Sequence, residues 1–148
     1  MEKAIADRQA LTGQHLGRVQ QFMDAGKTGE AETLLDAISP DPRADADTLL
    51  KMAVAYVKLG KPGKGAALMH RLTDSNPDDW EFWFHLARMQ ALAGKASEAA
   101  AALGKAFALN SSDRLTNQAL TNLHEFVRQD KSFDAIRQTP DYQKTVKN

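Results

Sequence analysis

The chain has 148 residues, 19 Lys and Arg against 19 Asp and Glu, and no Cys. This length fits one ordinary domain with a real hydrophobic core, and the missing Cys excludes thiol nucleophiles, zinc fingers and disulfides. A formal net charge of zero, with 43% hydrophobic and 26% charged residues, argues against both a nucleic-acid partner and intrinsic disorder.

The N-terminal segment, residues 1–10, lacks the apolar core of a signal peptide. No window of the chain holds the roughly 18 consecutive apolar residues that span a bilayer. We therefore expect a cytoplasmic protein without direct membrane insertion. If Met1 is not the natural start and a signal or anchor has been removed, a periplasmic or membrane-tethered location stays open. Residues 3–11 are predicted to extend the first helix, because no helix breaker precedes Gly13.

A pattern of 34 residues recurs three times along the chain. Residues 46–79 align without a gap over 80–113, and a further step back places about 12–45 in the same register. Each copy carries glycine followed by lysine at one position: Gly26-Lys27, Gly60-Lys61 and Gly94-Lys95. A repeat of this length predicts an array of stacked supersecondary units.

Each copy is predicted to form two amphipathic helices joined by a short turn. In the third copy Gly94 ends the first helix as a left-handed C-terminal cap, and an Ala-rich second helix follows from about Ser97 to Leu109. In the second copy Pro62 suits the first turn of the second helix. No stretch alternates with period two for long enough to predict a strand. The fold class is therefore all-α.

The region after the third copy is predicted to close the array. Ser111 or Ser112 is expected to cap a helix that runs to about Arg128. A shorter helix from Ser132 and a last turn beginning at Pro140 follow. The apolar face of the long helix is predicted to contain Leu115, Ala119, Leu120, Leu123 and Val127.

These units resemble the tetratricopeptide repeat. The resemblance covers residues 12–113 and is strongest in the second copy, at Leu49, Met52, Ala53, Tyr56, Gly60, Gly65, Met69, Leu72 and Pro77. It implies a right-handed α-solenoid with repeats at about 12–45, 46–79 and 80–113, and a capping helix and tail over 114–148. The ending, with Phe133, Ile136-Arg137 and Pro140-Asp141-Tyr142, is similar to the closing segment of many bacterial tetratricopeptide proteins.

The resemblance also implies a concave groove lined by the first helix of each unit. The partner-binding residues that it places there are Leu16, Gln20, Met23, Leu50, Val54, Val57, Trp80, Phe84, Arg88 and Asn122. This apolar trough suits a helix or an extended hydrophobic segment of a protein partner. We predict a non-catalytic adaptor or scaffold. The alternative is a structural or self-associating domain of a larger, membrane-anchored assembly, as a homo-oligomer or against another part of it.

One subclass of the family is disfavoured. Members that hold the acidic C-termini of heat-shock chaperones use a clamp of Lys, Asn and Arg in the groove. The corresponding places here hold Leu16, Gln20, Lys51, Glu81 and His85. Only Lys51 is basic, and Glu81 would repel the terminal carboxylate.

An aromatic stripe stands out at the start of the third copy. Trp80, Phe84 and Arg88 are spaced i, i+4 and i+8, which places them on one helical face. Trp and Arg are common binding hot spots, so the stripe is a candidate ligand anchor. The competing interpretation is that these aromatic rings pack between helices.

No motif in the chain predicts catalysis, a cofactor or a metal. Gly26-Lys27-Thr28 resembles the end of a phosphate-binding loop, but Gln21 replaces the required glycine and no strand precedes it. The four histidines lack the spacing of two ligands on one helical face. Asp78-Asp79 is expected at a helix start, where carboxylates accept from free amides. An enzyme or a small ligand-binding domain is therefore the least favoured class.

Overall fold

The computed structural model describes residues 2–38, 46–112 and 117–146, and side chains over 13–38, 46–110 and 123–146. Within these ranges the secondary structure is helical, with no strand. The elements are α1 (Glu2–Asp24), α2 (Thr28–Ala37), α3 (Ala46–Lys58), α4 (Pro62–Ser75), α5 (Trp80–Leu92), α6 (Ala96–Ser112), α7 (Asn117–Gln129), the 3-10 helix η1 (Lys131–Ile136) and α8 (Pro140–Val146). The all-α helical-repeat prediction is confirmed.

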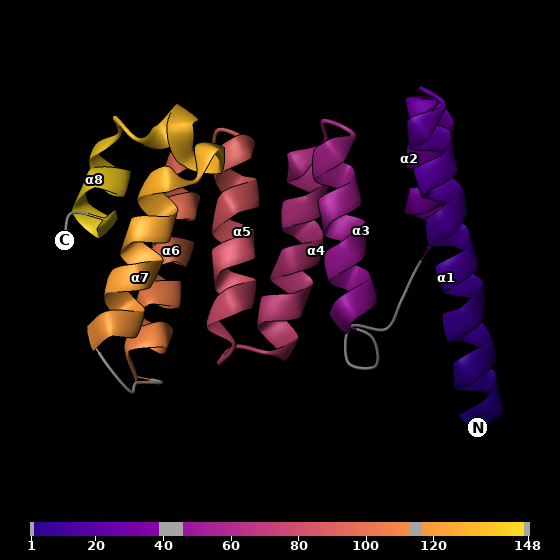
Figure 1. Cartoon of the computed structure of the whole chain (residues 1–148), viewed down its shortest axis with the longest axis horizontal. Coiled ribbons are helices and arrows are strands. Elements are labelled where there is room, and N and C mark those ends of the chain that lie inside the picture. The colour runs from indigo at the N-terminus through magenta and orange to yellow at the C-terminus, as the bar shows by residue number, and fades with distance from the viewer. Residues whose placement is uncertain (1, 39–45, 113–116, 147–148) are drawn as a thin grey trace.

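The helices stand side by side in one row, with the two chain ends at opposite ends of it (Figure 1). Consecutive helices pack as antiparallel pairs, α1 with α2, α3 with α4 and α5 with α6. The row is closed by α7, η1 and α8, of which α8 packs on α6 and η1 on α5. As predicted, residues 3–11 are part of the first helix.

The first helix of each pair ends in the same type of glycine cap. Gly26, Gly60 and Gly94 have φ values of 75°, 77° and 79°, a conformation that a side chain disfavours. In each cap the lysine after the glycine donates its backbone N–H to a carbonyl five residues earlier, at 2.8, 2.8 and 2.9 Å for Lys27, Lys61 and Lys95. These are Schellman motifs, which satisfy carbonyls that the helix end leaves free. The left-handed cap predicted at Gly94 is confirmed.

The starts of the following helices also obey local rules. Pro62 opens α4, where its missing N–H costs nothing because that donor has no partner within a helix. The Asp79 carboxylate accepts the backbone N–H of Glu81 at 3.0 Å and caps α5. The structure thus confirms the predicted positions of Pro62 and Asp79.

The end of the third pair differs from the prediction. The expectation that Ser111 or Ser112 caps the next helix is wrong, because both residues are the last turn of α6. Nothing between Lys105 and Ser112 breaks a helix, and a cap preference alone does not stop one. The next helix, α7, begins at Asn117. Leu115 and the side chains of Ala119 and Leu120 lie outside the described residues, whereas Leu123 and Val127 are buried as predicted.

Two hydrophobic clusters hold the row together. The larger one runs without a break from α3 to α8, and the smaller one joins α1 and α2 to Met52 and Tyr56 of α3. Inside the larger cluster, Gly65 allows the closest approach, since a Cβ there would lie 2.8 Å from the Ala53 carbonyl oxygen. The matching positions in the other pairs hold fully buried Ala31 and Ala99. A small residue at this place therefore sets how tightly each pair packs.

Candidate functional site

Two grooves are formed by the first helices of successive pairs. The N-terminal groove, of about 400 Å³, lies between α1 and α3. It brings together five of the predicted binding residues, Leu16, Gln20, Met23, Leu50 and Val54. Its floor includes the buried Val19. Lys51 and Lys58 stand along the α3 wall, and the Lys51 ammonium is 3.0 Å from the Asp47 carboxylate.

The C-terminal groove, of about 530 Å³, lies between α5, α6 and α7. It contains the whole predicted stripe of Trp80, Phe84 and Arg88. Glu81 and His85 complete the α5 wall, and the opposite side is formed by Asn110, Leu123 and Phe126. The predicted binding residues are therefore divided between two separate grooves.

Two predicted residues are in neither groove. Val57 is half-buried and packs against the larger hydrophobic cluster. Asn122 belongs to α7, but its side chain lies outside the described residues.

Phe84 forms the floor of the C-terminal groove rather than a free anchor. It is only 6% exposed, and its ring contacts Phe126 edge-on and Phe133 at centroid distances of 5.6 and 6.2 Å. Such ring contacts add to the hydrophobic stabilisation. Replacing Phe84 would therefore damage the core as well as the groove.

Phe126 is the residue that sequence reasoning missed. It is 57% exposed at the edge of the C-terminal groove, which is unusual for a large aromatic side chain. It lies three residues after Leu123, and this spacing places it beside the predicted apolar face of α7. An exposed ring packed against a buried one offers a partner an apolar surface that is already held in place.

Arg88 is held by the end of the chain. Its Nε lies 3.1 Å from an Asp130 carboxylate oxygen and donates to the Ser132 hydroxyl at 3.4 Å. The Asp130 side chain also caps η1 by accepting the Ser132 backbone N–H at 2.9 Å. Arg88 therefore ties α5 to η1, and its charge is already paired.

Two polar atoms of the C-terminal groove are buried without a hydrogen-bond partner among the described residues. They are Nδ1 of His85 and Oδ1 of Asn110. Burial, followed by the charge of Arg88, lowers the pKa of His85, so the ring is neutral near pH 7. A buried polar atom without a partner costs about 1–3 kcal/mol, and a ligand that hydrogen-bonds to it recovers part of that cost.

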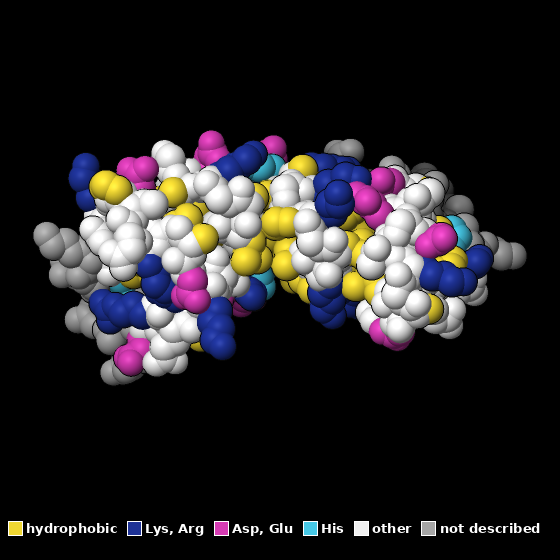
Figure 2. Space-filling model, turned by 90° about the horizontal axis from the view of Figure 1, so that it is seen from above, with side chains coloured by type: hydrophobic (Ala, Val, Ile, Leu, Met, Phe, Trp, Pro, Cys, Tyr) yellow, Lys and Arg dark blue, Asp and Glu magenta, His cyan; other side chains and the backbone are white. Residues whose placement is uncertain are grey.

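The space-filling view shows where hydrophobic side chains reach one face of the molecule. Hydrophobic side chains gather near the middle of the molecule, where its outline is indented (Figure 2). Among the described residues, no group of three His, Asp or Glu side chains is placed to hold a metal ion. None of the helices, over the same residues, is long and apolar enough to cross a membrane.

Comparison with known proteins agrees with this architecture. A family model described as a tetratricopeptide repeat matches residues 50–114, which include the glycine caps at Gly60 and Gly94. Over residues 50–114, the match confirms the resemblance found in the sequence. No curated protein matches the chain.

Proposed function

Since residues 50–114 belong to the tetratricopeptide repeat family, whose repeats mediate contacts between proteins, we propose that this chain holds an extended, apolar segment of a partner protein. The C-terminal groove is the principal site. The N-terminal groove provides a second apolar contact for the same segment.

The unpartnered atoms of His85 and Asn110 carry this proposal. The Asn110 oxygen can only accept, and no described residue donates to it, so a ligand that contacts it must bring a donor. An extended segment presents free backbone N–H groups, whereas a helix uses most of its own internally. The proposal therefore favours an extended segment over a helical one for this groove.

Phe126 and Trp80 supply the apolar part of the proposed contact. Both line the groove, and Trp80 is half-buried against the larger hydrophobic cluster. A ligand side chain seated between these rings would cover Phe126, the most exposed of the large hydrophobic side chains described. Burying apolar area contributes about 25 cal/mol per Å² before the costs of association.

A peptide-display selection against the full chain tests the proposal. Selected peptides should quench Trp80 fluorescence, and Phe126→Ala should weaken their binding by about tenfold or more. Leu92→Ala is the matched control, because Leu92 is 43% exposed on α5 but lines neither groove. Equal losses in the two variants, or selected peptides that are helical when bound, would contradict the proposal.

The alternative of self-association is tested by sedimentation over a concentration series. We expect a monomer whose mass is unchanged by Phe126→Ala. A dimer that this substitution dissociates would assign the C-terminal groove to a second copy of the chain.

A further inference from the structure

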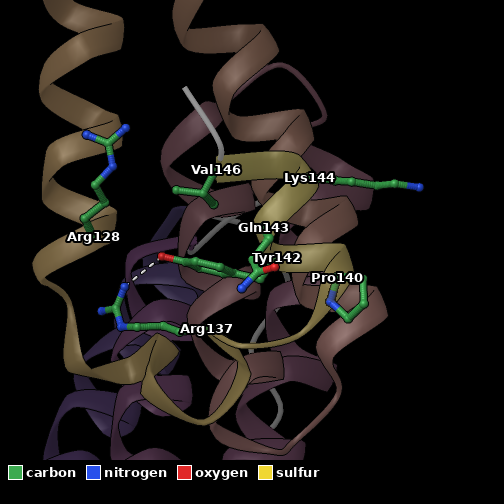
Figure 3. A pocket seen from close by; sticks show the side chains of 7 residues that line it. All are labelled: Arg128, Arg137, Pro140, Tyr142, Gln143, Lys144 and Val146. Carbon is green, nitrogen blue, oxygen red and sulfur yellow. Dashed lines mark hydrogen bonds between the residues drawn. The ribbon is translucent and has the colours of Figure 1, made fainter.

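A third concavity, of about 660 Å³, lies between α7 and α8, outside the two grooves. Its floor is formed by the buried Tyr142 and Val146 (Figure 3). Arg128 of α7 and Arg137, which follows η1, stand on the side of the Tyr142 hydroxyl. Lys144 also borders this cleft, but its side chain extends away from Tyr142. The cleft therefore combines an apolar floor with cationic walls.

Arg137 is held in place by four hydrogen bonds. Its Nε donates to Asp134 at 2.9 Å and its Nη1 to the Tyr142 hydroxyl at 2.7 Å. Its Nη2 donates to the carbonyl oxygens of Val127 and Asp130, at 3.4 and 2.5 Å. A guanidinium has five N–H groups, so one hydrogen on Nη1 is left without an acceptor among the described residues.

The Tyr142 hydroxyl also has an unused hydrogen. Tyr142 is 6% exposed, and in the described part of the chain its oxygen accepts from Arg137 but donates to nothing. Burial raises the pKa of Tyr142 against the opposing charges of Arg137 and Arg128, so the hydroxyl keeps its proton near neutral pH. Two neighbouring atoms, 2.7 Å apart, thus each retain one donor.

Arg128 adds a charge that no acidic side chain among the described residues compensates. No acidic side chain lines the cleft, and over the described residues no ion pair is formed by Arg128. The Asp134 carboxylate is already paired with Arg137. Arg128 is exposed, and its guanidinium extends along α7 away from the Tyr142 hydroxyl, so it would turn toward the cleft to pair with an anion there (Figure 3).

We infer that the cleft between α7 and α8 binds a carboxylate of an acidic peptide segment. One carboxylate oxygen accepts from the Tyr142 hydroxyl and the other from Nη1 of Arg137, while Arg128 pairs with the charge. Charge-assisted bonds to a carboxylate with two donors side by side are among the strongest in proteins. The apolar floor at Val146 receives a neighbouring aliphatic side chain of the segment.

The donor set fits a carboxylate better than a phosphate group. A phosphate needs donors for three oxygens, and helix N-termini often supply them. At the start of α8, the backbone N–H groups of Tyr142 and Gln143 are already bonded to the hydroxyl and the carbonyl of Thr139. These two N–H groups are therefore not free for a phosphate, whereas the donors on Arg137 and Tyr142 match the two oxygens of a carboxylate.

Titration of the ¹⁵N-labelled full chain tests the inference. The probe is a capped pentapeptide of alternating Leu and Glu, and its Gln counterpart and inorganic phosphate are run beside it. We expect the Glu peptide to shift the amide signals of α8 and the end of α7. Arg128→Gln and Tyr142→Phe should each raise its Kd about tenfold, because each removes one contact to the charged group.

Lys144→Gln is the matched control, since it removes the same charge from a side chain that points away from Tyr142. It should leave the Kd within about twofold. An equal loss in Lys144→Gln, no loss in a folded Tyr142→Phe, or equal binding of the Gln peptide would overturn the inference. Tighter binding of phosphate, or signal shifts confined to the grooves, would overturn it too. None of these results depends on Phe126, so the inference and the proposed function fail separately.

Discussion

The two ends of the row are joined to its middle by different means. The N-terminal pair, α1 and α2, approaches α3 and α4 less closely than α4 approaches α5, and Figure 1 shows the wider spacing of its ribbons. A small hydrophobic cluster connects it to α3. The C-terminal block, α3 to α8, shares one continuous cluster and is tied further by Arg88 and Arg137.

The polar contacts of the N-terminal pair are mostly exposed to solvent. Asp36 accepts from the Tyr56 hydroxyl at 2.5 Å and lies 3.0 Å from the Lys64 ammonium, which also pairs with Glu32 at 2.8 Å. Exposed ion pairs contribute little to stability. In a linear array each unit is stabilised by its own core and its neighbours. The N-terminal pair should therefore open before the C-terminal block does.

This difference bears on the roles that we propose for the two grooves. The N-terminal groove lies across the weaker joint, so its width can adapt to a ligand. The C-terminal groove is built on Phe84 and Phe133, which are buried in the continuous cluster. A preformed site loses less entropy when it binds, which favours the C-terminal groove as the principal one.

Removing Phe133 should have the largest effect on the C-terminal block. The ring is fully buried, and its centroid lies 6.2 Å from those of both Phe84 and Tyr142. Phe133→Ala should lower the free energy of unfolding by about 3–5 kcal/mol. Urea denaturation followed by circular dichroism measures this loss. A loss below about 1 kcal/mol would mean that the end of the chain is not part of the cooperative core.

Removing Leu35 should loosen the N-terminal pair alone. Leu35 is fully buried in the smaller cluster, so Leu35→Ala should cost the pair about 2–4 kcal/mol. Hydrogen exchange should accelerate in α1 and α2 while α5 and α6 stay protected. Uniform acceleration along the chain would show that the two regions unfold as one unit.

Gly65→Ala should weaken the tight packing within the C-terminal block. The new Cβ would lie 2.8 Å from the Ala53 carbonyl oxygen and 3.0 Å from the Met89 sulfur, and backbone cannot move aside cheaply. We expect a loss of about 1–3 kcal/mol in thermal or urea unfolding. Gly63→Ala is the control: a Cβ there meets nothing within 4 Å, so it should be neutral or slightly stabilising. Similar effects in the two variants would contradict the packing argument.

Lowering the pH should have the smallest effect on stability, and only on that of the N-terminal pair. The Tyr56 hydroxyl, followed by the Lys64 ammonium, holds the pKa of Asp36 below its ordinary value. Because the pKa of Asp36 is lower in the folded state, its ionised form stabilises the fold at pH values above the unfolded pKa of about 4. This stabilisation is lost as the pH falls through the folded-state pKa. Because these side chains are exposed, we expect less than about 1 kcal/mol. Asp36→Asn should remove this pH dependence from the exchange rates of α2, and an unchanged profile would contradict it.

The features that the sequence predicted correctly are local ones. The left-handed cap predicted at Gly94 depends on a hydrogen bond that spans five residues, so a short stretch of sequence is enough to specify it; the structure has the same cap at Gly26 and Gly60. Pro62 and Asp79 act within one helical turn. The error at Ser111 and Ser112 is instructive, because a good cap residue permits a helix boundary without imposing one.

The candidate sites were only partly predictable. The spacing of Trp80, Phe84 and Arg88 placed them correctly on one helical face. It could not show whether Phe84 is a buried residue in the floor of the groove or an exposed residue available to a ligand. That distinction depends on Phe126, Asp130 and Phe133, which lie at least one helix away in the chain. The exposure of Phe126 follows from where α7 packs, and no pattern within α7 fixes that.

By itself, the sequence determined that this protein is an array of paired helices, and that residues 50–114 match the tetratricopeptide repeat. Hydrophobic periodicity and glycine caps act over a few residues, so they can be read directly from the chain. Only the tertiary structure decided that most of the predicted binding residues are divided between two separate grooves, and that Arg137 contacts Tyr142 on the side of Arg128. Contacts of this kind depend on how whole helices pack against each other. That packing is stabilised by many weak contacts between residues distant in sequence.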